Sequence, residues 1–252
     1  MVKFNFYTVI IGTELLNGRR ADSHFNFVNQ ELLKRDWEHK GSFLIDDDPA
    51  LIERIYNLIK DDPTSVLFSF GGIGATPDDK TREVSGRVFT NESLKIHQEA
   101  LEKIEKRFKE IFKEEAASRL EISGRAMAEL PVGAEIVENP YNQIPGYSLE
   151  GRFFFLPGFP EMAHPMVVNI LDEHFLKGNK KFRKTITVYA GEGCLIDIMR
   201  EIPENIETSS LPSVEGKTVF SLSSYSEDEL IKWFEFSKKK LEEKNIEIGV
   251  GK

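Results

Sequence analysis

The sequence predicts an α/β protein with a three-layer α/β/α domain around a mostly parallel sheet, followed by a small C-terminal α+β domain. Apolar, β-rich runs alternate with segments of helical periodicity along the first ninety residues. Each of these runs ends at a loop rich in glycine or aspartate. A lysine-rich stretch at 177–184 then precedes a tail with its own strand and helix pattern. We therefore divide the chain into a domain of residues 1–177 and a second domain of residues 178–252.

Three strand–loop–helix units are expected in the first domain. The strands are the apolar runs Phe4–Ile11, Ser42–Ile45 and Ser65–Phe70. The helices that follow them are expected to begin at a cap on Asp22 or Ser23, near Pro49, and at a cap on Asp79 or Thr81. Strands that alternate with helices in this way are typical of a parallel sheet with helices on both faces.

The remaining elements are expected from periodicity and from Pro and Gly punctuation. Glu92–Phe112 predicts one long amphipathic helix, with Leu101, Ile104, Phe108 and Ile111 on one stripe. Pro131–Pro165 predicts loops and brief strands that cross one edge of the sheet. In the tail we expect strands at Thr185–Tyr189 and Thr218–Leu222 and helices from about Cys194 and Asp228.

Composition excludes several classes of protein. A net charge of −9 disfavours nucleic acid as a partner, because the basic residues are scattered along the chain. The single cysteine, Cys194, excludes an internal disulfide and a cysteine-built zinc site. We find no apolar run of about eighteen residues, so no membrane partner is expected. The N-terminal run is too short for a signal peptide, and a cytoplasmic location is expected.

Three strand ends have residues suited to a phosphate or metal site. They are Gly12–Glu14, Asp46–Asp48 and Gly71–Gly74, the last of these followed by Asp78 and Asp79. The carboxyl ends of parallel strands meet at one edge of a sheet, so these loops are expected to line one crevice. Glycines let the backbone approach a phosphate closely, whereas carboxylates beside a phosphate require a divalent cation between them. Taken singly, a glycine cluster is also typical of a tight turn, and an aspartate run of a solvated helix cap.

The motifs around these loops resemble the N-terminal domain of the competence/damage-inducible protein A (CinA) family. The segments that support the resemblance are GTELLNGRRADSHFNFVNQEL at 12–32, FGGIGATPDDKTRE at 70–83, Asn139-Pro140, Pro145-Gly146 and LPGFPEM at 156–162. More loosely similar are GEGC at 191–194 and SSLPSVE at 209–215. His24, Ala75 and Gln143-Ile144 depart from the family pattern.

The resemblance implies the molybdopterin-binding fold of MoaB and MogA. Full-length members of the CinA family add a C-terminal deamidase domain, which is not expected in this chain.

The resemblance also implies roles for individual residues. The catalytic residues would be Asp47, Asp79 and Glu14, with Asp47 and Asp79 holding a divalent metal cation. The ligand-binding residues would be Gly12, Thr13, Gly71, Gly72, Gly74, Thr76, Asp78, Asn139, Pro145, Gly146, Pro157 and Gly158.

The function that the resemblance implies is a metal-dependent pyrophosphatase acting on an ADP-ribose-like nucleotide. One alternative is a molybdopterin-binding protein or molybdopterin adenylyltransferase, with molybdopterin as the ligand. Another is a nucleotide-binding module without catalysis. In each case the partner is a small-molecule nucleotide or pterin.

A homo-oligomer, a dimer or a trimer, is also expected. The small C-terminal domain or the Pro131–Pro165 loops would contribute to the interface. Phe153, Phe154, Phe155, Phe159 and Met162 gather apolar side chains that would suit either this interface or an edge strand packed under helices.

Overall fold

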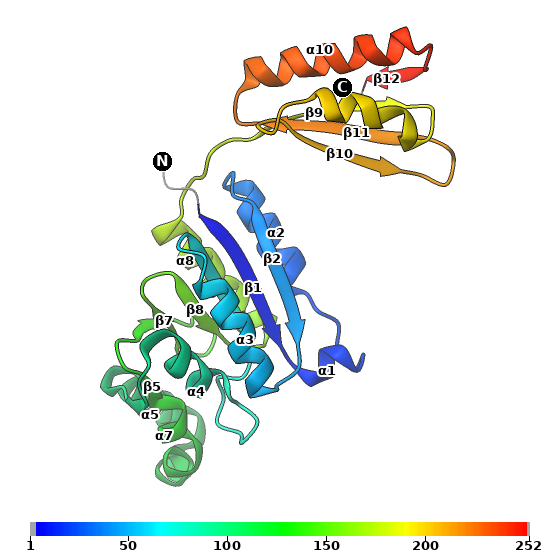
Figure 1. Cartoon of the computed structure of the whole chain (residues 1–252). Coiled ribbons are helices and arrows are strands. Elements are labelled where there is room, and N and C mark those ends of the chain that lie inside the picture. The colour runs from blue at the N-terminus through cyan, green and yellow to red at the C-terminus, as the bar shows by residue number, and fades with distance from the viewer. Residues whose placement is uncertain (1–3, 251–252) are drawn as a thin grey trace. The chain divides into compact units, whose positions relative to one another are not determined.

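The computed structural model describes residues 4–250 and divides the chain into two compact units, residues 1–178 and 179–252 (Figure 1). In the part of the chain that is described, no helix is long and apolar enough to cross a membrane.

The first unit is built on a six-stranded sheet in the order β2-β1-β3-β8-β7-β6. Its strands are β1 (Asn5–Ile11), β2 (His39–Ile45), β3 (Ser65–Phe70), β6 (Glu135–Val137), β7 (Gly146–Leu149) and β8 (Phe153–Leu156). The four strands β2, β1, β3 and β8 run parallel, and β7 pairs antiparallel with both β8 and β6. A separate two-stranded ribbon joins β4 (Leu94–Ile96) to β5 (Glu129–Pro131).

The first unit has eight α-helices among its described residues, and the longer ones cover both faces of the sheet. The eight helices are α1 (Thr13–Leu16), α2 (His24–Lys34), α3 (Pro49–Lys60), α4 (Thr81–Ser85), α5 (Gln98–Phe112), α6 (Ala116–Arg119), α7 (Arg125–Ala128) and α8 (Pro160–His174). One apolar core joins the sheet to α2 and α8, and a second joins its other face to α3, α4 and α5. Figure 1 shows α3 and α2 on opposite faces. The three-layer α/β fold predicted from the sequence is confirmed.

The phenylalanines of β8 belong to the core. Phe153 and Phe155 are fully buried on the α3 face, and Phe154 is 2% exposed on the α2 face. Side chains alternate across a strand, so a strand in the middle of the sheet needs apolar residues at every position. The expectation that these three residues contribute to an oligomer interface is therefore wrong. Phe159, at 57% exposure, is not in the core, and the oligomeric state stays a prediction.

Several element boundaries differ from those predicted. The Glu92–Phe112 segment is not one helix: it begins with β4, and α5 starts only at Gln98, where the His97 ring caps the Ala100 amide. Ile111 is 47% exposed and lies off the buried stripe. The Pro131–Pro165 segment contributes strands to the main sheet rather than only crossing its edge, and α8 begins within it.

The second unit is an antiparallel sheet in the order β10-β11-β9-β12, packed against two helices. Its elements are β9 (Phe182–Val188), α9 (Ile196–Glu201), β10 (Glu207–Pro212), β11 (Thr218–Ser224), α10 (Glu227–Glu243) and β12 (Ile248–Val250). Alternate residues of β9 and β11 supply the core, including Ile186, Val188, Phe220 and Leu222. This is the small α+β unit that the sequence predicted, with β10 and β12 in addition.

Candidate functional site

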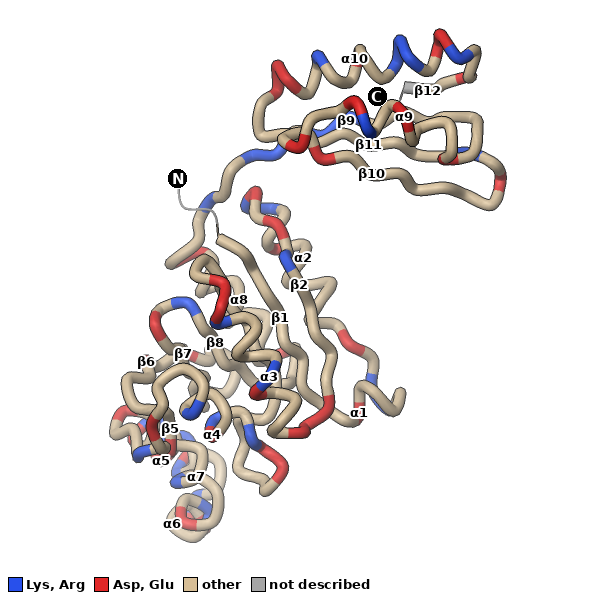
Figure 2. Tube along the Cα trace, viewed as in Figure 1, with Lys and Arg blue, Asp and Glu red and all other residues tan. Residues whose placement is uncertain are grey.

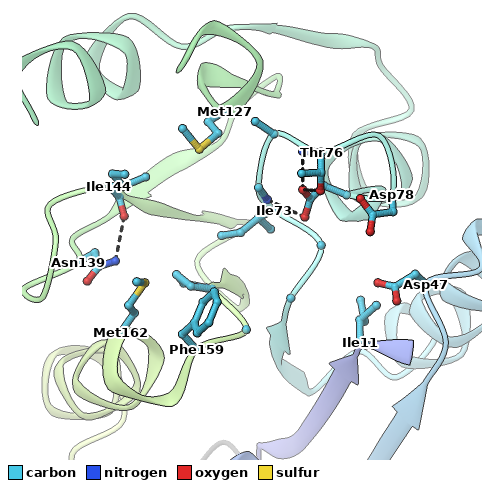
Figure 3. Close-up of a pocket in the computed structure, with 18 of the residues that line it drawn as sticks. Ile11, Asp47, Ile73, Thr76, Asp78, Met127, Asn139, Ile144, Phe159 and Met162 are labelled. Carbon is cyan, nitrogen blue, oxygen red and sulfur yellow. Dashed lines mark hydrogen bonds between the residues drawn. The ribbon is translucent and has the colours of Figure 1, made fainter. Parts of the chain in front are cut away.

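A cavity of about 520 Å³ lies at the carboxyl ends of the parallel strands (Figure 3). The loops that follow β1, β2, β3 and β8 all contribute to its lining. The residues that the sequence predicted for the site and that line this cavity are Gly12, Glu14, Asp47, Gly71, Gly72, Gly74, Thr76, Asp78, Asp79, Asn139, Pro145, Pro157 and Gly158. The expectation that the three strand-end loops line one pocket is confirmed, whereas the roles of these residues stay predictions.

The cavity has an acidic side and an apolar side. Glu14, Asp47, Asp78 and Asp79 line the acidic side, and Figure 2 shows acidic residues both at the end of β2 and in the loop before α4. Figure 3 shows the apolar side chains that gather on the other side, which are Ile73, Met127, Ile144, Phe159 and Met162. Most of the apolar residues come from segments distant in sequence. The departures from the family pattern indicated Ile144 as close to the pocket, whereas sequence reasoning missed Ile73, Met127, Phe159 and Met162 as lining residues. This arrangement suits a ligand with an apolar part and a charged part.

Thr13 does not line the cavity, but it positions Asp47. Its amide and its hydroxyl both lie within hydrogen-bond distance of Asp47 Oδ2, at 2.9 and 2.8 Å. The same hydroxyl lies 2.7 Å from Asp46 Oδ1. Thr13 stands in the first turn of α1, a helix that the sequence reasoning missed, and it joins the ends of β1 and β2. Asp47 is thereby held with its carboxylate at the cavity (Figure 3).

The first residues of α4 hold the glycine-rich loop after β3 through hydrogen bonds to its carbonyl groups. Thr81 donates from its hydroxyl to the Gly71 carbonyl and from its amide to the Gly72 carbonyl. The buried Arg82 guanidinium donates to the carbonyls of Ile73 and Gly74. Four successive carbonyl groups are thus hydrogen-bonded on the protein side of the loop.

Asp79 folds back onto this loop instead of capping α4. Its Oδ1 accepts the Gly74 amide at 2.9 Å, and its Oδ2 accepts the Thr76 amide and hydroxyl. The residue at the cap position of α4 is Lys80, so the expected cap at Asp79 or Thr81 is wrong. Both carboxylate oxygens of Asp79 accept hydrogen bonds from the loop, so Asp79 chiefly stabilises the conformation of the loop. The carboxylates of Asp47 and Asp78 remain directed at the cavity in Figure 3.

These bonds decide which loop amides remain for a ligand. The Gly71 amide donates to the Leu156 carbonyl, and the Gly74 amide donates to Asp79. Within residues 4–250 the amides of Gly72, Ile73 and Ala75 have no acceptor, and all three residues line the cavity. Of the predicted glycines, only Gly72 therefore has a backbone amide that remains available to a ligand, together with the amides of Ile73 and Ala75.

Two other predicted residues have structural roles. The buried Asn139 side chain holds its own turn, donating to Asn142 Oδ1 and the Ile144 carbonyl and accepting the Tyr141 amide. Gly146 does not line the cavity, since it lies in β7, where an added Cβ would be 2.6 Å from the Phe155 carbonyl oxygen. Asn139 thus shapes the cavity wall, and Gly146 permits close strand packing.

The His24 side chain packs beside the site, against the end of β3 and the loop after β8. Its ring is 3% exposed and stacks on Phe70 at 4.2 Å, and its Nε2 lies 3.2 Å from the Gly158 carbonyl oxygen. Because a carbonyl oxygen only accepts, Nε2 carries the proton in this contact. Burial lowers the pKa of His24 to about 4, so the ring is neutral near pH 7.

The buried His24 makes stability depend on pH. An unfolded histidine titrates near pH 6.5, so the unfolded chain binds the proton first as the pH falls. Stability is full above about pH 6.5 and is lost towards pH 4, and His24 alone should lower the free energy of unfolding by about 2 kcal/mol between pH 7 and pH 5. Urea denaturation at both pH values measures this change.

A His24→Gln variant is the matched comparison for this pH effect, because glutamine retains a donor for the Gly158 carbonyl. It should show a smaller loss of stability. The pKa of His39 is also lowered to about 4 by burial, and His39 contributes equally in both proteins. An identical loss in the two proteins would contradict the assignment to His24.

The oxygen donors at the acidic side fit a hard divalent cation only in part. Carboxylates are the ligands that Mg²⁺ and Ca²⁺ prefer, and Asp47 and Asp78 provide them at the cavity. Within residues 4–250, however, no three His, Cys, Asp or Glu side chains are grouped to hold a metal ion. A cation here would take its other ligands from water and from the phosphates of a substrate, as is common for Mg²⁺.

The fold and the cavity together define a small-molecule-binding α/β domain with its site at the carboxyl edge of the sheet. The sequence profile of a family described as "Probable molybdopterin binding domain" matches residues 7–177. Protein TK1472 of Thermococcus kodakarensis is 31% identical over 234 residues, which cover 87% of this chain and 89% of that protein. The chain belongs to the molybdopterin-binding domain family.

Two further comparisons show similarity to proteins described as CinA or CinA-like. A CinA-like protein of Acaryochloris marina is 33% identical over 165 residues, which cover 63% of this chain but 37% of that protein. The crystal structure of the protein CinA with unknown function from Thermoplasma acidophilum matches with a TM-score of 0.56 at 22% identity. This match covers 69% of the present chain and 98% of that one, and it shows the shared fold.

Proposed function

We propose that this protein hydrolyses the diphosphate linkage of an ADP-ribose-like nucleotide with the help of a divalent cation. The single observation that supports this proposal best is the placement of acidic side chains beside a glycine-rich loop with free backbone amides, opposite an apolar cavity wall. The apolar side suits a planar base, and the loop suits a phosphate.

Charge is the reason to include a cation. The lining holds four carboxylates, Glu14, Asp47, Asp78 and Asp79, and one guanidinium, that of Arg20. The formal balance of these side chains is −4 + 1 = −3, which repels a diphosphate. A divalent cation would supply the positive charge that offsets the phosphate oxygens and Lewis-acid polarisation of the phosphate group. Asp47 and Asp78 are the residues that would hold it.

The other residues act on the substrate and on water. The amides of Gly72 and Ile73 donate to a phosphate oxygen and stabilise the charge that develops on it. The Glu14 carboxylate lies at the cavity, close enough to Gly12 that an added Cβ there would be 2.8 Å from Glu14 Oε2. We assign Glu14 as the base that takes a proton from water as the water oxygen bonds to phosphorus. The bond from phosphorus to the bridging oxygen then breaks, which gives AMP and ribose 5-phosphate.

The test is hydrolysis of ADP-ribose by the purified protein with and without Mg²⁺. We expect AMP release that stops when EDTA is added and returns when Mg²⁺ is restored in excess, because the carboxylates otherwise repel the substrate. Chromatography of the products measures it. Undiminished hydrolysis in EDTA would refute the cation, and no hydrolysis with Mg²⁺, Mn²⁺ or Co²⁺ would refute the reaction.

A second candidate is binding or adenylylation of molybdopterin, which the family match over residues 7–177 favours. The apolar side of the cavity would accept a pterin as readily as an adenine. Incubation with molybdopterin and Mg-ATP separates the candidates, since transfer of AMP to the pterin would replace the hydrolase proposal. Binding of nucleotide without any turnover would instead favour a non-catalytic module.

A further inference from the structure

Arg20 is a cation at the cavity that the reaction proposed above does not use. It lies in the loop between α1 and α2, and its backbone amide donates to the Glu14 carbonyl at 3.1 Å. Its guanidinium carbon lies 5.1 Å from the centroid of the Phe159 ring. Both side chains line the cavity, and they come from segments about 140 positions apart in the sequence. The fold thus brings one arginine over one aromatic ring at the ligand site.

The Arg20 guanidinium is also unpaired. Among the described residues that line the cavity it is the single Lys or Arg side chain. Within residues 4–250 it forms no ion pair and no side-chain hydrogen bond, although Glu14, Asp47 and Asp78 line the same cavity. The adjacent Arg19, in contrast, donates from its Nε to Asn17 Oδ1 and lies outside the cavity lining.

The chemistry of this pair points to an oxyanion. A guanidinium stacked on an aromatic ring keeps the N–H groups along its edge available, and these match two oxygens of a phosphate. The ring limits the rotamers of the arginine, so less entropy is lost when the anion binds. An unpaired arginine at an otherwise acidic cavity therefore has an anionic ligand group as its natural partner.

We propose that Arg20, held on Phe159, is the phosphate receptor of this site and selects phosphorylated ligands over the corresponding nucleosides. The ligand class is a nucleotide with a phosphate at Arg20 and its planar base on the apolar wall. This inference names the class of ligand that the site of the proposed function binds. It rests on the proposed function only where it concerns which bond of that ligand is cleaved. The binding step stands on the Arg20–Phe159 geometry.

Calorimetric titration with AMP and with adenosine, in the presence of Mg²⁺, tests this proposal. Arg20→Met should weaken AMP binding at least about tenfold, because a charge-assisted hydrogen bond is lost, and should leave adenosine binding within about twofold. Arg20→Lys retains the charge but not the planar guanidinium that can donate two hydrogen bonds to one phosphate, so it should recover only part of the AMP affinity. Arg19→Met, which removes the neighbouring cation, should bind both ligands as the wild type does. Melting temperatures of all variants establish that each is folded.

The outcomes separate this inference from the proposed function. Equal AMP affinity in wild type and Arg20→Met, or AMP binding no tighter than adenosine binding in the wild type, would overturn the phosphate receptor. If AMP binding depends on Arg20 and no ADP-ribose is cleaved, the receptor stands and the hydrolase proposal fails. If ADP-ribose is cleaved and its KM is the same in Arg20→Met, the hydrolase stands and the receptor fails.

Discussion

Asp47→Asn is expected to lower the rate of ADP-ribose hydrolysis by about a hundredfold or more while the melting temperature stays unchanged. The substitution removes the charge that would hold the cation. The amide oxygen of asparagine can still accept the Thr13 amide and hydroxyl, which now bond to Asp47 Oδ2 at 2.9 and 2.8 Å. The loss should therefore be chemical rather than structural, and initial rates at saturating Mg²⁺ measure it.

The neighbouring Asp48 provides the matched control. Its carboxylate accepts the Ala50 amide at the start of α3, and it does not line the cavity. Asparagine caps helices as well as aspartate does, so Asp48→Asn should retain both activity and stability. Equal rates for Asp47→Asn and the wild type would remove Asp47 from the site. Equal losses in the two variants would indicate only a general effect of negative charge.

Gly71→Ala is expected to lower the free energy of unfolding by about 3 kcal/mol and to abolish nucleotide binding. Gly71 has a φ of +95°, and an added Cβ would lie 2.5 Å from the Ile11 carbonyl oxygen. That oxygen belongs to the end of β1, which is paired on both sides within the sheet, so it cannot move away from the added Cβ. The loop would have to move instead, which displaces the amides of Gly72 and Ile73. Urea denaturation and AMP titration measure the two effects.

Gly18→Ala separates steric conflict from backbone strain. Gly18 also has a positive φ, +75°, but nothing lies within 4 Å of an added Cβ. Its substitution should cost about 1 kcal/mol, the usual strain of a left-handed residue, and leave binding intact. If the two alanine variants are equally stable, the close approach between the glycine loop and β1 has no energetic importance.

The sequence predicted best where a local pattern is sufficient. Ser65–Phe70 is apolar enough to be buried at all six positions, and it forms β3 with the predicted bounds. Helix α3 begins at Pro49 with Asp48 as its cap, because proline suits the first helical position and aspartate accepts the free amide that follows. The convergence of the strand-end loops on one cavity follows from parallel topology alone.

The sequence predicted the structure less well where a side chain has two available partners. The Asp79 carboxylate could cap α4 or accept hydrogen bonds from its own loop. Only the conformation of that loop brings the Gly74 and Thr76 amides to Asp79. The phenylalanines of β8 suited either an interface or a core. Because β8 pairs with β3 and β7, these phenylalanines lie in the core. In both cases the choice depends on neighbours that no local pattern specifies.

By itself the sequence determined the fold class and the loops that meet at the carboxyl edge of the sheet, because burial and strand direction follow from local patterns. The tertiary structure alone decided which amides of the glycine loop remain free, that the buried His24 supports Gly158, and that Arg20 lies over Phe159. The physical reason is that each of these depends on a contact between distant segments, and such contacts exist only when the chain is packed.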